Sequence, residues 1–81
     1  MNLQLQPVQV ATKSDDTESQ LVFVDGFLVA VLVRLSELHE HDAGKWFLEA
    51  GFGRIDPICP PVFADLDEAQ AWILEQLSPG P

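Results

Sequence analysis

The sequence predicts a small two-layer α+β domain, in which a three- to four-stranded antiparallel sheet carries one C-terminal helix on one face. Two apolar runs rich in β-branched residues are joined by Asp25-Gly26, a pair typical of a tight hairpin turn. Near the other end of the chain, a capping pattern precedes apolar residues spaced three or four apart, which indicates a helix. A length of 81 residues is that of one domain, so residues 1–81 are expected to fold together.

The first strand is expected within residues 3–12, where apolar and polar residues alternate on either side of Pro7. Proline has no N–H to donate to a neighbouring strand, so this strand belongs at an edge of the sheet or contains a bulge. Residues 13–19 are polar and acidic without periodicity, which predicts an exposed loop.

The central hairpin runs from Leu21 to about Leu35 around its turn. A two-residue turn pairs Val24 with Phe27, Phe23 with Leu28, Val22 with Val29, and Leu21 with Ala30. Because side chains alternate along a strand, one face would hold Val22, Val24, Phe27, Val29, Val31, Val33 and Leu35, and the other Leu21, Phe23, Leu28, Ala30 and Leu32. Both faces are apolar, so each is expected to be covered.

After a polar connection at residues 36–45, residues 46–53 have the character of a strand. Alternation places Trp46, Leu48, Ala50 and Phe52 on one face, and Phe47 and Glu49 on the other. Three prolines within residues 54–64 exclude both a helix and a central strand there.

The final element is a helix that begins after Asp65, a good N-cap residue, with Glu68 at the spacing of a capping box. Its apolar stripe consists of Leu66, Ala69, Ile73 and Leu77, and the segment from Ser78 to Pro81 ends it. Trp72 lies off this stripe. It is either an exposed anchor for a partner or a ring folded back against Phe63 or the strand edge.

The formal net charge of −9 comes from 13 acidic and 4 basic residues, and the basic residues are scattered singly. Binding to nucleic acid or to an anionic membrane requires clustered cations, so neither partner is expected. The apolar run at residues 27–33 is too short to span a bilayer, and no signal peptide pattern precedes it. The single cysteine, Cys59, cannot form an internal disulfide and fits a reducing, cytoplasmic compartment.

The helix accounts for one apolar face of the hairpin, and the other face is left for association. The leading hypothesis is a non-enzymatic module that self-associates as a homodimer, or binds another protein, through this face or an open strand edge. The candidate contact residues are Leu21, Phe23, Leu28, Ala30 and Leu32, or their counterparts on the opposite face, together with Phe47 and Trp72. Alternatively, the N-terminal strand or the proline-rich loop caps the second face within the monomer.

A metal- or ligand-binding protein is the alternative function, using His39 and His41 with Asp42 or Cys59 in a zinc-like site. The competing interpretation of these histidines is a solvated acidic loop. No catalytic motif or cofactor fingerprint is present, so we expect neither an enzyme nor a cofactor, and Cys59 is expected to be an inert packing residue. A third hypothesis is that the acidic surface mimics nucleic acid and blocks a basic partner.

Overall fold

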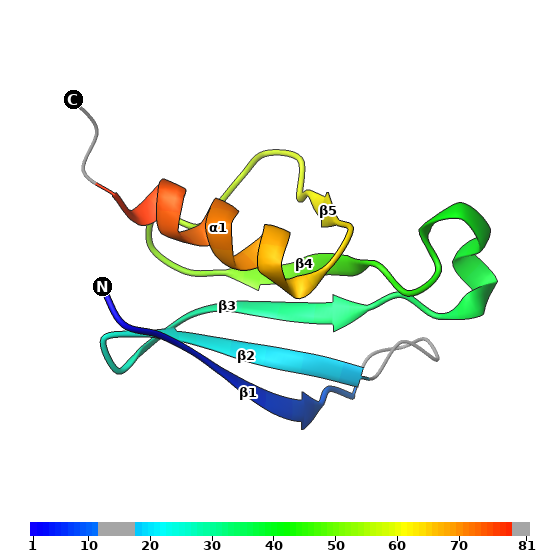
Figure 1. Ribbon diagram of the computed structural model, residues 1–81, viewed down its shortest axis with the longest axis horizontal. Helices are drawn as coiled ribbons and strands as arrows, with labels where there is room; N and C mark the ends of the chain where they lie inside the picture. Colours follow the sequence, from blue (N-terminus) through cyan, green and yellow to red (C-terminus); the bar gives the residue numbers. More distant parts are fainter. Residues whose placement is uncertain (12–17, 79–81) are drawn as a thin grey trace.

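A computed structural model describes residues 1–11 and 18–78 of the chain, except the side chains of residues 38 and 39. Five antiparallel strands form one sheet in the order β1-β2-β3-β4-β5, and a single α-helix, α1, follows them (Figure 1). The strands are β1 (Leu3–Gln9), β2 (Glu18–Val24), β3 (Phe27–Arg34), β4 (Trp46–Gly51) and β5 (Val62–Phe63), and α1 spans Leu66–Leu77. The predicted α+β class is confirmed, with a sheet slightly larger than the three or four strands expected.

Strand β1 lies at an edge of the described sheet and pairs only with β2, as Pro7 predicts. The Asp25 N–H donates to the Asn2 carbonyl at 2.9 Å, so the backbone of Asn2 faces β2. Along an antiparallel strand, the backbone N–H and C=O groups of successive residues point alternately toward and away from a given neighbour. The polar backbone groups of Leu3, Leu5, Pro7 and Gln9 therefore point away from β2. Pro7 therefore costs the ladder no hydrogen bond. Of the predicted loop, residues 13–17 lie outside the described residues, as does residue 12 of the predicted strand, and Glu18 and Ser19 belong to β2.

The hairpin turn has the predicted geometry, because Asp25 and Gly26 both have positive φ (53° and 87°), as a type I′ turn requires. The predicted pairs Val24–Phe27 and Phe23–Leu28 are present. Beyond them the predicted register is wrong, since a β-bulge between Val22 and Phe23 pairs Val22 with Ala30 and Leu21 with Val31.

The bulge leaves Val29 as an extra residue of β3, and both Val29 and Ala30 lie in the core. A shift of one residue moves every following side chain to the other face. The helix side of the hairpin therefore holds Val22, Val24, Val29, Ala30 and Leu32, and the opposite side holds Leu21, Phe23, Leu28, Val31 and Val33.

Strand β4 also departs from the predicted alternation. Leu48 pairs with Leu32 while Ala50 pairs with Val31, so Glu49 is the extra residue of a second bulge. Ala50 consequently shares the face of Phe47 instead of that of Leu48, and Phe52 lies beyond the strand with 47% of its surface exposed. The connection before β4 contains a 3₁₀ helix, η1 (Glu37–Asp42), in place of the plain loop expected.

The chain after β4 folds back on the strand. Gly51 lies so close to Ile55 that a Cβ at position 51 would overlap the Ile55 carbonyl oxygen, which explains the glycine. Ile55 itself is fully buried in the core. The two-residue β5 pairs Phe63 with Trp46 at the edge of the sheet, and the described part of residues 54–64 contains neither a helix nor a central strand, as predicted.

The helix begins as predicted, because the Asp65 side chain accepts a hydrogen bond from the Glu68 N–H at 2.8 Å. The Glu68 carboxylate in turn accepts from the N–H of Ala64, one residue before the cap. Ala69 and Ile73 of α1 are buried in a core that also contains Val22, Val24, Val29, Ala30, Leu32, Trp46, Leu48, Ile55 and Phe63. No described helix is both long and apolar enough to cross a membrane.

Candidate interaction surface

One face of the sheet is turned away from α1 and is here called the far face. The register shows which residues belong to it, because directly opposed residues on neighbouring strands share a face. The residues opposed to the core positions fix the helix side, and the alternate positions form the far face. Its members are Gln4, Gln6 and Val8 of β1, Ser19, Leu21 and Phe23 of β2, Leu28, Val31 and Val33 of β3, Phe47 and Ala50 of β4, and Val62 of β5. Nine of these side chains are apolar, and three are neutral and polar.

Exposure varies systematically across the far face. Leu28, next to the hairpin turn, and Val62, in β5, are 37% and 41% exposed. At the opposite end of the hairpin, Ser19 and Val33 are 0% and 2% exposed, although neither belongs to the core cluster under α1. The far face is therefore accessible at Leu28 and Val62 and buried at Ser19 and Val33. Its other apolar strand residues, Leu21, Phe23, Val31, Phe47 and Ala50, are half-buried.

Most charges of the chain lie away from the far face. The five strands contain only three charged residues, Glu18, Arg34 and Glu49. Glu18 and Arg34 lie on the helix side, where the Arg34 guanidinium and the Glu18 carboxylate form an exposed ion pair at 3.3 Å. Glu49, the exposed extra residue of the β4 bulge, follows the helix-side Leu48 and therefore lies on the far face beside Ala50. The helix α1 carries acidic residues and has no basic residue in its last turn.

The backbone edges of the sheet offer little room for an added strand. On the β1 edge, Pro7 removes one of the outward N–H groups, which interrupts the row of donors that a pairing strand needs. On the other edge, β5 pairs with the first part of β4, and the chain at Ile55 covers Gly51. The far face is thus a larger unpartnered surface than either edge of the described sheet.

The structure places four of the predicted contact residues, Leu21, Phe23, Leu28 and Phe47, together on the far face. Ala30 and Leu32 do not lie there, because the bulge turns both toward α1, where each is 0% exposed. The bulges instead bring Val31 and Ala50 to the far face, in positions that strict alternation does not predict. Neither bulge contains a glycine that would mark it in the sequence.

Neither segment proposed to cap the second face covers it. The N-terminal strand extends the sheet sideways as β1, and Ile55, from the connection that leads to the proline-rich loop, packs in the core on the helix side. Figure 1 shows the connection between β4 and β5 together with α1. Within residues 1–11 and 18–78, these two segments therefore leave Leu28 and Val62 of the far face exposed.

Trp72 adopts the second of its two predicted alternatives. Its ring centroid lies 5.4 Å from that of Phe63, with the ring planes tilted by 52°, a favourable aromatic geometry. Trp72 is half-buried and packs against the core cluster. The tryptophan thus joins the helix to β5 on the helix side of the sheet.

The residues of the alternative metal site are not gathered. Among the described residues, no group of three or more His, Cys, Asp or Glu side chains is placed to hold a metal ion. His41 is exposed, and the side chain of His39 lies outside the description. Cys59 is also exposed, so the expectation that it is a packing residue is wrong. Figure 1 shows η1, which carries His41, beyond the end of the sheet and away from the connection that carries Cys59. The metal-site hypothesis stays a prediction from the sequence.

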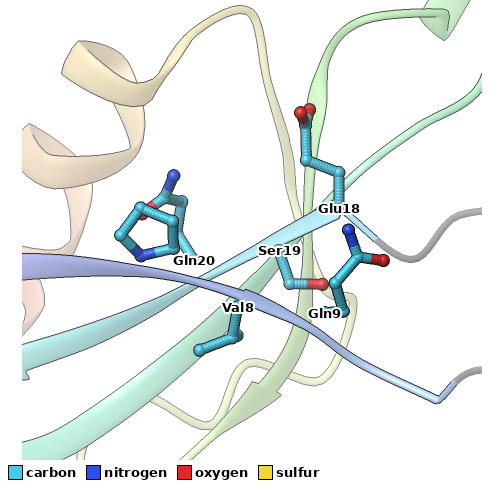
Figure 2. Close-up of a pocket in the computed structure, with 6 residues that line it drawn as sticks. Val8, Gln9, Glu18, Ser19 and Gln20 are labelled. Atoms are coloured by element: carbon cyan, nitrogen blue, oxygen red, sulfur yellow. The ribbon is translucent and has the colours of Figure 1, made fainter.

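A shallow hollow of about 330 Å³ lies at the end of the β1–β2 pair. Figure 2 shows Val8 and Ser19 on one side of the two strands and Gln20 and Glu18 on the other, so the hollow wraps around the strand ends. The Glu18 carboxylate at this hollow is engaged by Arg34. The hollow has no built polar site of its own.

Comparison with known proteins gives no relative from which a function can be transferred, because no family model, curated protein or solved structure matches the chain.

Proposed function

We propose that this chain is a non-enzymatic interaction module that binds a protein partner, or a second copy of itself, through the far face. The observation that supports this proposal is the contrast between the two faces of one hairpin. Val22 and Val24 on the helix side are covered by α1, whereas Leu21, Phe23 and Leu28 on the far face keep accessible apolar surface. Contiguous apolar surface of this kind is typical of association sites. A cytoplasmic location is part of the same proposal.

The test uses two adjacent residues of β3 that point to opposite sides. Val29 is 9% exposed and packs in the core, and Leu28 is 37% exposed on the far face. An aspartate at position 29 buries an unpaired charge, so Val29→Asp is expected to lower the free energy of unfolding by more than about 3 kcal/mol and to unfold this small domain. Leu28→Asp keeps its charge in water, and we expect a loss below about 1 kcal/mol.

Circular dichroism and thermal unfolding measure the fold of both variants. Association is measured as solution mass and as the set of proteins that an immobilised chain retains from a cell extract. We expect Leu28→Asp to remain folded and to lose the associations that the wild-type chain shows. The proposal is wrong if both variants unfold equally, since the far face would then be internal to the fold. It is also wrong if folded Leu28→Asp keeps every association of the wild type.

A further inference from the structure

We infer that β1 is a releasable cover strand, and that its release opens the edge of β2 to an extended segment of another chain in which apolar and polar residues alternate as they do in β1. The site is a backbone edge, so it is independent of the far face on which the proposed function rests. Strand β1 pairs with β2 alone, through seven residue pairs from Leu3–Val24 to Gln9–Glu18. Its release therefore breaks one strand pairing and leaves the others in place.

Side-chain burial holds β1 less firmly than any other strand of the described sheet. None of its seven residues is buried, and Leu3, Leu5 and Val8 are only half-buried. Each of the other four strands contributes at least one buried residue, and α1 contributes Ala69 and Ile73. Segments with few buried apolar side chains open locally, at a free energy below that of global unfolding. Strand β1 is therefore expected to open before the rest of the sheet.

The edge that β1 covers is more apolar than the edge that β1 itself presents. Residues 21–24 of β2 are Leu-Val-Phe-Val, whereas β1 alternates leucine with glutamine and contains Pro7. When β1 is released, the backbone N–H and C=O groups of Leu21 and Phe23 lose their partners. An apolar edge with such free groups is a template for pairing with another chain, and natural proteins commonly cover it.

The chemistry of the incoming segment follows from the side chains that β1 supplies. Leu3 and Leu5 lie opposite Val24 and Val22 and pack against the core. The residues that follow each leucine in β1 are glutamines, and both are exposed. A segment that replaces β1 therefore needs apolar side chains two residues apart to cover the core, with polar ones between them in water. Backbone pairing supplies the affinity, and the alternate side chains supply the selectivity.

A reciprocal pair of hydrogen bonds closes the β1–β2 pairing at the hairpin turn. The Asn2 N–H donates to the Asp25 carboxylate at 2.9 Å, and the Asp25 N–H donates to the Asn2 carbonyl at 2.9 Å. The turn itself requires only positive φ at position 25, which glycine also provides. The Asp25 carboxylate therefore has a second role, as the latch that holds the start of β1.

Hydrogen exchange of the full chain, followed residue by residue by NMR, tests the release of β1. The amide groups of Gln4, Gln6 and Val8 face β2, so their exchange reports the opening of this pairing. We expect them to exchange at least about tenfold faster than the slowest amides of β3, which open only in global unfolding. Equal protection of the two strands would overturn the inference, because β1 would then open only with the whole domain.

Two variants that keep the turn test the latch. Asp25→Asn keeps an acceptor oxygen for the Asn2 N–H, and Asp25→Gly removes it. We expect the amides of Gln4 and Gln6 to exchange about two- to tenfold faster in Asp25→Gly than in Asp25→Asn, the effect of one net hydrogen bond. Equal rates in these variants would overturn the role of Asp25 as the latch.

A synthetic peptide of residues 1–9 is the probe for the opened edge. It makes the same contacts as β1, so it competes with the effective concentration of the tethered strand, which is about millimolar for short linkers. With about 1 mM peptide, we expect the β1 amides of the full chain to exchange at least about tenfold faster, because the peptide holds β1 off the edge. The control peptide carries Leu3→Ser and Leu5→Ser and should have little effect.

Unchanged exchange with the unmodified peptide would overturn the site, and so would equal acceleration by both peptides, since the alternating apolar side chains would then not be recognised. Slower exchange of β1 would also overturn it, because the peptide would then be pairing with the outer edge of β1. The far face is tested separately by Leu28→Asp, so the two proposals can fail independently.

Discussion

Val22 of β2 lies opposite Ala30 of β3, because the bulge inserts Val29 between the hairpin turn and this pair. Val22 and Ala30 are both completely buried beneath the helix. The inserted residue also moves Val31 to the far face, between Leu21 and Ala50 of the neighbouring strands. A single extra residue thus decides which side chains stabilise the monomer and which remain available for association.

The bulge can be tested by enlarging Ala30. Its side chain is 0% exposed between Val22 and Gly51, so Ala30→Leu is expected to overpack the core and to lower the free energy of unfolding by about 1–3 kcal/mol. Urea denaturation measures the change. The control is Val31→Leu on the far face, for which we expect less than about 1 kcal/mol. A tolerated Ala30→Leu with a destabilising Val31→Leu would show that the register has no bulge.

Trp72 is expected to act in folding rather than in association. Trp72→Ala removes the contact with Phe63 and part of the core cover, and because the ring is half-buried we expect a loss of about 2–3 kcal/mol. Trp72→Phe keeps an aromatic pair and should lose less. Both variants should keep the association of the wild type, measured by sedimentation at a temperature where they are folded. A stable Trp72→Ala chain without association would instead identify Trp72 as a partner anchor.

Pro7 is expected to protect the β1 edge. Pro7→Val restores an outward N–H among those of Leu3, Leu5 and Gln9, so the edge becomes a continuous template for strand pairing. We expect faster formation of large aggregates, measured by light scattering and thioflavin fluorescence at elevated temperature. Gln9→Val is the matched control, because it adds the same side chain on the same edge without adding a donor. Equal aggregation of Pro7→Val and Gln9→Val would mean that the added hydrophobic side chain, and not the restored N–H, causes the aggregation.

The stability that the N-cap gives to α1 should depend on a hydrogen-bond acceptor at position 65 and not on the negative charge of Asp65. Asp65→Ala removes the acceptor for the Glu68 N–H and is expected to cost about 1 kcal/mol in urea denaturation. Asp65→Asn keeps a side-chain oxygen and should cost only a few tenths of a kcal/mol. A loss with Asn as large as that with Ala would mean that the negative charge near the helix N-terminus is the larger contribution.

Much of the fold is readable from local sequence. The Asp25-Gly26 turn, the cap at Asp65 and the edge position, which is one of the two alternatives that Pro7 predicts, each depend on the conformational limits of a few neighbouring residues. The structure contains all three. The existence of two apolar faces on the hairpin is likewise a property of composition along the strands.

The assignment of residues to those faces needed the tertiary structure. Ala30 and Leu32 were predicted contact residues, but both bulges lie in stretches of ordinary strand-forming residues, and nothing local distinguishes Val29 or Glu49 as the extra residue. A bulge is selected by how neighbouring strands and the helix pack, and here it places Val29 and Ala30 together in the core. The position of Trp72 against Phe63 was likewise decided by packing, here between α1 and the preceding strand β5.

The sequence by itself therefore determined the class of fold, the turn, the helix cap and the edge strand, because these depend on backbone preferences and periodicity within short segments. Only the tertiary structure decided which apolar residues face α1 and which form the far face. The physical reason is that side-chain direction in a strand has a period of two, so one inserted residue, chosen by long-range packing, reverses the direction of all that follow.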